Sequence, residues 1–215
     1  PPPAVVALAH DLLRGGDLVI EARKQWPSGL EEPKGRISPG FQTAPGRALA
    51  RLGDGGWNPV VEQLIAASEH GAAIDLDDQM LAAIAGVLKR WNWAARPTWI
   101  CPMPSRRRQS LIDAIAEGLG TLGKLPVHRV LIGVASSEAP AGSFQQDQAN
   151  SAHQVANVWH RFSIDPEALP ATAVLDGPVL LIDDEVDSRW TMTVAGHLLA
   201  GHGSGQVLPF ALRAR

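Results

Sequence analysis

Asp183 and Asp184 are the residues whose surroundings in the sequence best suit chemistry. They follow four apolar residues, and a short polar loop then leads into a helical pattern at residues 191–200. In open α/β sheets, ligands bind beyond the carboxyl ends of strands, and a helix N-terminus there attracts phosphate. Paired carboxylates at a strand end can accept hydrogen bonds from a ribose diol or hold a hydrated Mg²⁺ ion. The segment therefore predicts a site for a phosphorylated sugar, with ribose hydroxyls or a Mg²⁺ ion held by this acid pair.

Residues 179–192, VLLIDDEVDSRWTM, resemble the signature of type I phosphoribosyltransferases, which bind phosphoribosyl pyrophosphate. The apolar strand, the acid pair and Thr191 match that family. The loop differs, because Asp187-Ser188-Arg189 stands where the family has Thr-Thr-Gly. The aspartate would repel a 5′-phosphate, and arginine in place of glycine removes the freedom for a positive φ. The resemblance implies these ligand-binding residues: Asp183, Asp184, Asp187, Ser188, Arg189, Trp190 and Thr191.

A second resemblance covers roughly residues 85–215. Residues 99–108, WICPMPSRRR, followed by a helix and by GKLPV, resemble the start of ComF-type phosphoribosyltransferases, in which this loop binds pyrophosphate. It implies a second anion site at Ser105, Arg106 and Arg107. Further matches precede the acid pair: Gln146, Asn157, Val158 and Phe162.

In that family the stretch around residues 135–157 would form a hood over the site and carry basic side chains. Here no Lys or Arg lies between Leu131 and Val158. The departing pyrophosphate would then lack charge-assisted contacts that stabilise it in the transition state. This difference favours weak or absent transferase activity.

A third resemblance concerns the parent protein. IEARKQWPSGL, PGRALARL, GGWNP and NSAHQVANV resemble the C-terminal region of certain bacterial RecQ-like DNA helicases. The chain does not begin with methionine, as expected for a piece of a longer protein. The resemblance implies an accessory module of a cytoplasmic DNA-repair helicase, with DNA as a partner through the parent and a phosphoribosyl or phosphate ligand. The helicase ATPase motifs do not occur in this chain, so ATP hydrolysis is not assigned to it.

Residues 1–75 are expected to form a small basic module rich in Gly and Pro, a candidate winged-helix-like remnant. Seven basic and four acidic residues lie between Arg14 and Arg51, a net charge of +3. Basic side chains attract the phosphate backbone of nucleic acids. We expect such binding by Arg23, Lys24, Lys34 and Arg36.

The rest of the chain, residues 76–215, alternates strand and helix patterns. This alternation predicts an α/β fold of the type I phosphoribosyltransferase kind, with a mostly parallel sheet flanked by helices. Over the whole chain, strands are expected at residues 17–22, 98–102, 127–134, 178–182 and 206–212, and irregular structure is expected at 135–160. Helices are expected at residues 5–14, 58–67, 77–89, 109–122 and 191–200.

Composition argues against several classes of protein and of metal site. The net charge of −3 argues against a uniformly basic nucleic-acid binder, and the single Cys101, expected to be buried and inert, excludes a multi-cysteine zinc site. No apolar run approaches the length of a membrane span, so no membrane partner is expected. Three alternatives stay open. The arginine run at 106–108 could be a solvated charge run, and most tryptophans apart from Trp190 could be packing residues. The chain could also be an active ComF-type transferase using Mg²⁺.

Overall fold

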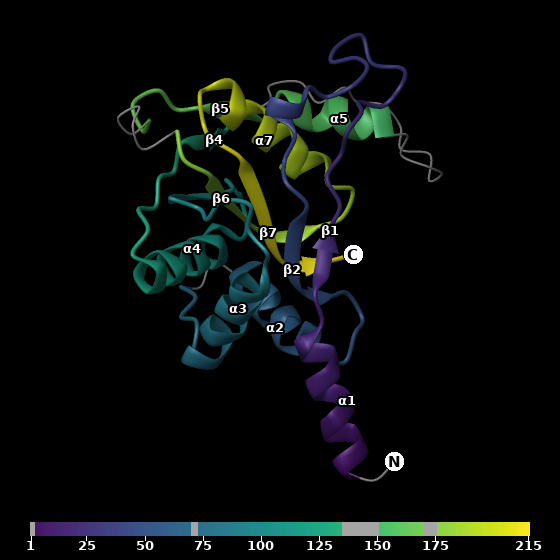
Figure 1. The fold of residues 1–215 in the computed structure, drawn as a ribbon, viewed down its shortest axis with the longest axis vertical. Coiled ribbons are helices and arrows are strands. Elements are labelled where there is room, and N and C mark those ends of the chain that lie inside the picture. The colour runs from purple at the N-terminus through teal and green to yellow at the C-terminus, as the bar shows by residue number, and fades with distance from the viewer. Residues whose placement is uncertain (1–2, 70–72, 135–150, 170–175) are drawn as a thin grey trace.

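The computed structural model describes residues 3–69, 73–134, 151–169 and 176–215. Its centre is a five-stranded sheet in the order β1-β2-β7-β6-β3 (Figure 1). The strands are β1 (Leu18–Ile20), β2 (Gly46–Arg51), β3 (Trp99–Pro102), β6 (Val179–Val186) and β7 (Val207–Ala214). β2, β7, β6 and β3 run parallel, and only β1 is antiparallel to its neighbour β2. The predicted α/β fold with a mostly parallel sheet flanked by helices is confirmed.

Helices cover both faces of this sheet. Side chains alternate along a strand, so neighbouring residues face opposite ways. Leu180 of β6 lines a cavity with residues of α3 (Asp78–Arg90) and α4 (Gln109–Gly123), and α2 (Asn58–Glu69) packs beside α4. Val207 of β7 is paired in register with Val179 and packs against Gly196 of α7 (Trp190–Gly201). One face therefore meets α2, α3 and α4, and the other meets α7.

The remaining elements lie at the edges of this body. α1 (Pro3–Gly15) projects away from it and carries the N-terminus (Figure 1). A second sheet pairs β4 (Leu131–Gly133) with β5 (Phe162–Ile164) in antiparallel fashion. α5 (Ser151–Trp159) packs on α7, as does the short 3-10 helix η1 (Pro39–Phe41).

Local sequence explains where α3 and α4 form. Asp77 precedes α3 and accepts a hydrogen bond from the Met80 backbone N–H at 2.7 Å, which caps the helix. Met80, Ile84 and Val87 recur at helical spacing and are buried. α4 instead ends at Lys124, whose backbone turns into the left-handed region at φ 52°.

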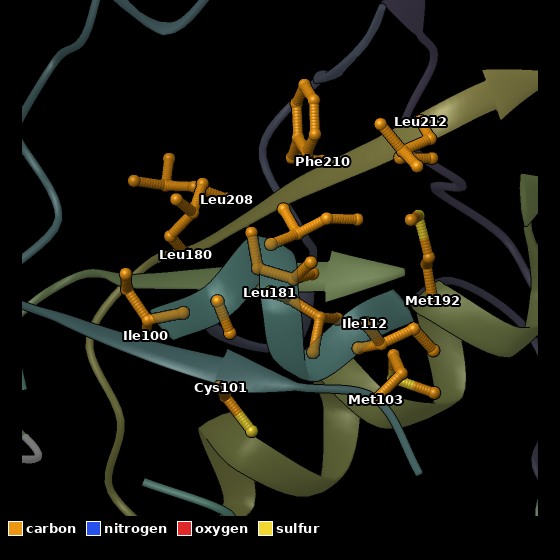
Figure 2. Close-up of a cluster of buried hydrophobic side chains, with 14 of the residues drawn as sticks. Ile100, Cys101, Met103, Ile112, Leu180, Leu181, Met192, Leu208, Phe210 and Leu212 are labelled. Atoms are coloured by element: carbon orange, nitrogen blue, oxygen red, sulfur yellow. The ribbon is translucent and has the colours of Figure 1, made fainter. Parts of the chain in front are cut away.

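The core lies between the central strands and the helices (Figure 2). Ile100, Leu181 and Phe210 come from three adjacent strands and are fully buried. Ile112 of α4 and Met192 of α7 close the two faces. Burying each such side chain contributes about 1.5–3 kcal/mol, so the strands that carry the site are held firmly. Cys101 is fully buried here, as predicted, and burial raises the pKa of its thiol to about 12.

Several predicted element bounds are wrong. The strand expected at 178–182 continues to Val186, and the strand expected at 127–134 shrinks to β4, which pairs outside the main sheet. Residues 151–159, expected to be irregular, form α5, while residues 135–150 lie outside the described residues. The strand at residues 46–51 was missed, because Gly, Arg and Ala carry little strand signal.

The predicted boundary at residue 75 falls between α2 and α3. Both helices pack on the same sheet, and β2 of the N-terminal part pairs with β7 of the C-terminal part. Ala48 of β2 also belongs to the same core cluster as Phe210 of β7. Strands from both sides of the predicted boundary thus share one sheet and one core.

Candidate functional site

The two aspartates lie where the neighbouring strand ends. β3 pairs with β6 as far as Pro102 and Ile182, and Asp183 is the next residue of β6. β6 itself continues against β7, with Asp183 paired to Ala211 and Val186 paired to Ala214. The acid pair therefore stands at the carboxyl end of β3, inside a strand that is parallel to both of its neighbours. That is the edge at which open α/β sheets bind ligands.

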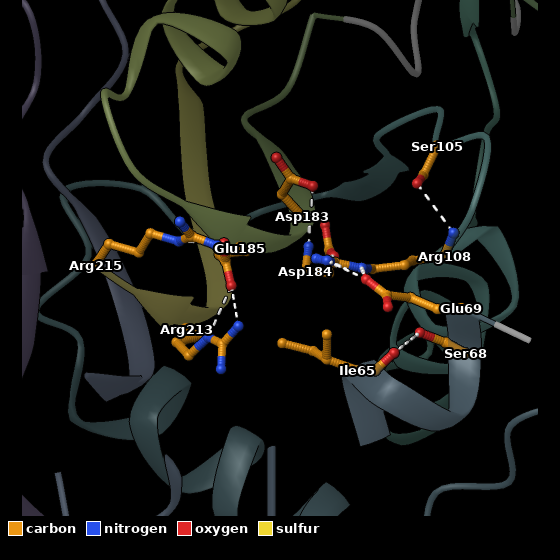
Figure 3. Close-up of polar contacts among 10 residues, drawn as sticks. All are labelled: Ile65, Ser68, Glu69, Ser105, Arg108, Asp183, Asp184, Glu185, Arg213 and Arg215. Atoms are coloured by element: carbon orange, nitrogen blue, oxygen red, sulfur yellow. Dashed lines mark hydrogen bonds and ion pairs between the residues drawn. The ribbon is translucent and has the colours of Figure 1, made fainter. Parts of the chain in front are cut away.

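The two aspartates leave β6 on opposite faces, yet their carboxyl groups lie close enough to interact. Asp184 follows the direction of Leu180 toward α2 and α4, whereas Asp183 follows that of Val179 toward α7. In Figure 3 the Asp184 backbone N–H donates a hydrogen bond to Asp183 Oδ1 at 2.9 Å. The two aspartates line two different cavities. The expectation that both bind one ligand stays a prediction.

Asp184 lines a cavity of about 490 Å³ that we call the arginine pocket. Its floor is the loop between β3 and α4, and its far wall comes from the β4–β5 sheet. The pocket contains four arginines and one acid, and it is lined by Pro104, Ser105, Arg106, Arg107, Arg108, Gly133, Val134, Arg161, Phe162, Asp184 and Thr191. The predicted second anion site at Ser105, Arg106 and Arg107 thus shares one cavity with Asp184.

Arg108 joins the pocket to helix α2. Its Nη1 donates to Asp184 Oδ2 at 2.7 Å, and its Nη2 donates to Glu69 Oε1 at 2.6 Å (Figure 3). Burial alone would lower the pKa of the Arg108 guanidinium, but the hydrogen bonds to these two carboxylates outweigh it and raise that pKa. Ser105 Oγ accepts a hydrogen bond from the Arg108 backbone N–H at 3.1 Å, which fixes the start of α4. Arg108 is therefore a positive charge fixed by two carboxylates, while Arg106, Arg107 and Arg161 are exposed at the pocket wall.

Asp183 has no comparable cation beside it. Burial raises the pKa of the Asp183 carboxyl well above its usual range, and the neighbouring Asp184 charge raises it further. Its more distant attraction to Arg108 only partly offsets these effects. Asp183 is thus the acid that holds a proton more readily, and Asp184 is the ion-paired partner.

Asp183 lines a smaller cavity of about 220 Å³, which we call the loop cavity. Its walls carry three acids and one arginine, and its lining is Asp183, Glu185, Val186, Asp187, Ser188, Arg189, Thr191 and Met192. Glu185 accepts hydrogen bonds from both Arg213 and Arg215, so these two arginines pair with Glu185. The sequence resemblance places a 5′-phosphate in this loop. Asp187 does line that cavity, so a phosphate there would meet negative charge.

The loop before α7 has a positive φ at a position where its sequence predicted none. Arg189 has φ 69° and precedes α7 as its N-cap, so the prediction that arginine removes the positive φ is wrong. Its carbonyl oxygen accepts hydrogen bonds from the backbone N–H and hydroxyl of Thr193 at 3.0 and 2.9 Å. A left-handed conformation costs a non-glycine residue about 1–2 kcal/mol.

Trp190 lies in the interior and does not line either cavity. It is 2% exposed and stacks near Trp26 with ring centroids 6.0 Å apart. The Arg23 guanidinium lies 4.5 Å above the Trp190 ring and donates to the Ser188 carbonyl oxygen at 2.9 Å. Burial, and then repulsion from Arg189, lower the pKa of Arg23. Trp190 and Arg23, predicted to bind ligand and nucleic acid, thus hold the loop in place.

The other residues predicted to bind nucleic acid lie apart from both cavities. Arg36 forms an isolated antiparallel bridge with Gln25, and next to it Ile37 donates its backbone N–H to the Lys24 carbonyl at 3.0 Å. Lys24, Lys34 and Arg36 are exposed, and so are the nearby acids Glu31 and Glu32. The basic surface is therefore small and mixed in charge.

Mg²⁺ binding by Asp183 and Asp184 stays a prediction. Asp184 is paired with Arg108, so this arginine would compete with a metal ion for its carboxylate. Across the residues that the structure describes, no group of three or more His, Cys, Asp or Glu side chains is placed to hold a metal ion. No described helix has the length and hydrophobicity needed to span a membrane.

Sequence reasoning missed two basic residues of the site. Arg108 closes the arginine run but was not assigned, because its partner Glu69 lies 39 residues away and on another helix. Arg161 lies three residues after the stretch 131–158, in which no Lys or Arg occurs. It comes just before β5 and lines the pocket. Its place beside Phe162, one of the residues matched to the ComF-type pattern, was the available signal.

Comparisons with known proteins give structural neighbours only. No protein-family model and no curated protein matches the chain. The chain is similar to the adenine phosphoribosyltransferase of Saccharomyces cerevisiae, with 13% identity, a TM-score of 0.37, and 97% of this chain and 89% of that chain covered. That enzyme was solved with a dideoxy-imino-altritol bisphosphate and adenine.

Two further neighbours belong to the same group of enzymes. The adenine phosphoribosyltransferase of Leishmania tarentolae has 13% identity and a TM-score of 0.41, over 95% of this chain and 86% of that one. The enzyme of Trypanosoma brucei, solved with AMP, pyrophosphate and ribose-5-phosphate, has 12% identity and a TM-score of 0.38. That match covers 83% of this chain and 84% of the neighbour.

Proposed function

We propose that this chain is a phosphoribosyltransferase-like domain that binds a phosphorylated ligand in the arginine pocket and has little or no transferase activity. The observation that carries the proposal is the gathering of four arginines around one acid at the carboxyl end of β3. Arginine forks match the geometry of phosphate oxygens and make charge-assisted hydrogen bonds. A pyrophosphate group is the chemistry that this surplus of positive charge suits.

The positions of the arginines favour a ligand held between two walls. Arg106 and Arg107 come from the loop before α4, and Arg161 comes from the start of β5 on the other side. All three are exposed, so each can reorient toward an anion. Arg108 is held by Asp184 and Glu69, and it adds a fixed positive charge at the base. Asp184 then lies within the same cavity as an acceptor for ribose hydroxyls.

Weak transferase activity follows from the loop cavity. A working site would hold the 5′-phosphate in the loop before α7 while pyrophosphate leaves from the other side. Here Asp187 lines that cavity together with Arg189. Glu185 is already paired with Arg213 and Arg215, and burial favours the protonated form of Asp183. Like charges raise the cost of binding an anion in a partly buried site. A ligand anchored at only one end would not be held in a reactive geometry.

The sequence resemblance to RecQ-like helicases supports the broader setting of the proposal. In that setting the chain is an accessory domain of a cytoplasmic DNA-repair helicase, and DNA reaches it through the parent protein. Lys24, Lys34 and Arg36 are exposed and available for weak phosphate-backbone contacts. Salt-sensitive binding of short DNA that falls when these three are replaced by alanine would support that role.

The second candidate is an active ComF-type transferase, favoured by Arg161. The sequence argument for lost activity rested on the missing basic residues at 131–158, and Arg161 supplies one from just outside that stretch. An active enzyme would use phosphoribosyl pyrophosphate with Mg²⁺, and the metal ion would assist the departure of pyrophosphate.

Calorimetry with phosphoribosyl pyrophosphate separates the two candidates. The binding domain predicts an affinity that changes little with Mg²⁺, and no release of pyrophosphate when purine or pyrimidine bases are added. Asp184→Asn would leave the Arg108 guanidinium nearby and weaken binding of the ribose. Mg²⁺-dependent binding with base-dependent pyrophosphate release would instead establish the transferase.

A further inference from the structure

We propose that the protein has a second binding site, for a flat aromatic anion, at the opposite end of the sheet from the aspartates. A cavity of about 660 Å³ opens there, a volume within the range of pockets that take small organic ligands. Ile100 and Leu180, each second in its strand, form part of its wall. We call it the Trp93 cavity, and it shares no lining residue with the arginine pocket.

Two stacked tryptophans give the cavity a flat wall. Trp91 and Trp93 lie with ring centroids 4.2 Å apart and planes inclined by 22°. Trp91 is 5% exposed and has the Arg47 guanidinium 5.2 Å from its ring centroid, so it is fixed from within. Trp93 is only partly buried and forms the outer ring of the pair. A planar ligand could extend this stack, since offset stacking favours ring against ring.

Much of the remaining wall is apolar. Leu88 comes from α3, Leu119 and Leu122 come from α4, and these two helices pack against each other. Leu122 is 57% exposed, so the cavity presents hydrophobic surface to solvent. Such a surface binds an apolar ring by removing both from water.

The side-chain charges at the mouth of the Trp93 cavity favour a negatively charged ligand. Lys89 and Arg96 are its charged lining residues, both exposed, and neither has an ion-pair partner among the described residues. Both α3 and α4 end here, and a helix C-terminus carries roughly half a negative charge. Two full positive side-chain charges outweigh these partial charges. A carboxylate or sulfonate attached to a flat ring fits this combination.

The test uses 1-anilinonaphthalene-8-sulfonate as the anionic probe and N-phenyl-1-naphthylamine as its neutral counterpart, each followed by fluorescence titration of the full chain. We expect saturable binding of the anion, weakened at least about tenfold by Trp93→Ala. Arg96→Ala should weaken the anion several-fold and leave the neutral probe unchanged. Arg90→Ala is the matched control, because it removes the same charge from a residue that pairs with Asp17 outside the cavity.

A surface variant keeps the test valid if Trp93→Ala does not fold. Leu122→Glu should abolish binding of the anionic probe, whereas Leu122→Gln should reduce it only modestly. Arg161→Ala should leave the probe's affinity unchanged, which separates this site from the arginine pocket. Equal affinity for both probes, insensitivity to both Trp93 and Leu122 variants, or loss on Arg161→Ala would overturn the proposal.

Discussion

Arg108 Nη1 donates a hydrogen bond to Asp184 Oδ2 at 2.7 Å, so one guanidinium links the start of α4 to the acid of the central strand. The same guanidinium reaches Glu69 at the end of α2. The side chains of Arg108 and Asp184 are 22% and 10% exposed, which limits screening by water. The site's geometry therefore depends on this pair.

Arg108→Ala should destabilise the protein by about 2 kcal/mol, because it leaves the buried Asp184 carboxylate without its cation. Arg108→Lys should recover part of this loss, since an ammonium makes fewer directed contacts than a guanidinium. Urea unfolding measures both. Arg129→Ala is the control, because Arg129 pairs with Asp113 and Glu117 on the surface and should cost at most about 1 kcal/mol. Equal losses for Arg108→Ala and Arg129→Ala would contradict this assignment.

Asp183→Asn should change how stability depends on pH. The folded-state pKa of Asp183 is raised by burial and by Asp184, so its protonated form is favoured in the native protein. The stability that this provides is fully present below the unfolded pKa of about 4 and is lost as pH rises through the folded value. Compared with the parent, Asp183→Asn should therefore gain stability between about pH 4 and pH 7. Urea unfolding across this range with no relative gain would refute the raised pKa.

Trp190→Ala should destabilise the protein by about 3–5 kcal/mol, as removing a buried tryptophan does. Trp190 packs with Trp26, and Arg23 covers its ring, so the loop before α7 should loosen as well. Thermal unfolding measures the loss. Arg23→Ala should cost less, on the order of 1 kcal/mol, from the cation–π contact and the hydrogen bond to Ser188. A cost under about 1 kcal/mol for Trp190→Ala would mean that this tryptophan is not a packing residue.

Arg189→Gly and Arg189→Ala form a matched pair that tests the left-handed backbone. Both remove the side chain beyond Cβ, but only alanine keeps the Cβ that strains a residue at φ 69°. The glycine variant should be about 1 kcal/mol more stable than the alanine variant. Chemical unfolding of the two proteins side by side gives this difference directly. If alanine were the more stable variant, residue 189 would not hold a positive φ.

The elements around the site could be predicted where the periodicity is strong. The apolar run before Asp183 predicted a buried parallel strand, and the helical spacing after it predicted α7. The end of β6 was placed four residues early, because Asp183 and Asp184 have low strand propensity and read as a loop. Pairing with β7 overrides that propensity as far as Val186.

The site itself could be predicted only in part. Sequence order placed Ser105, Arg106 and Asp184 at strand ends, and parallel strands bring such ends together. It did not show that the two aspartates lie inside β6 and leave it on opposite faces, because they were taken to follow the strand. It also could not pair Arg108 with Glu69, or bring Arg161 across from β5, since these contacts depend on tertiary packing.

The most direct test of the central claim is calorimetric titration of inorganic pyrophosphate into the protein and its Arg161→Ala and Arg129→Ala variants. The arginine pocket predicts a dissociation constant below about 1 mM for the parent, a loss of about tenfold with Arg161→Ala, and little change with Arg129→Ala, which lies outside the pocket. Absence of binding by the parent, or equal weakening by both variants, would contradict the account.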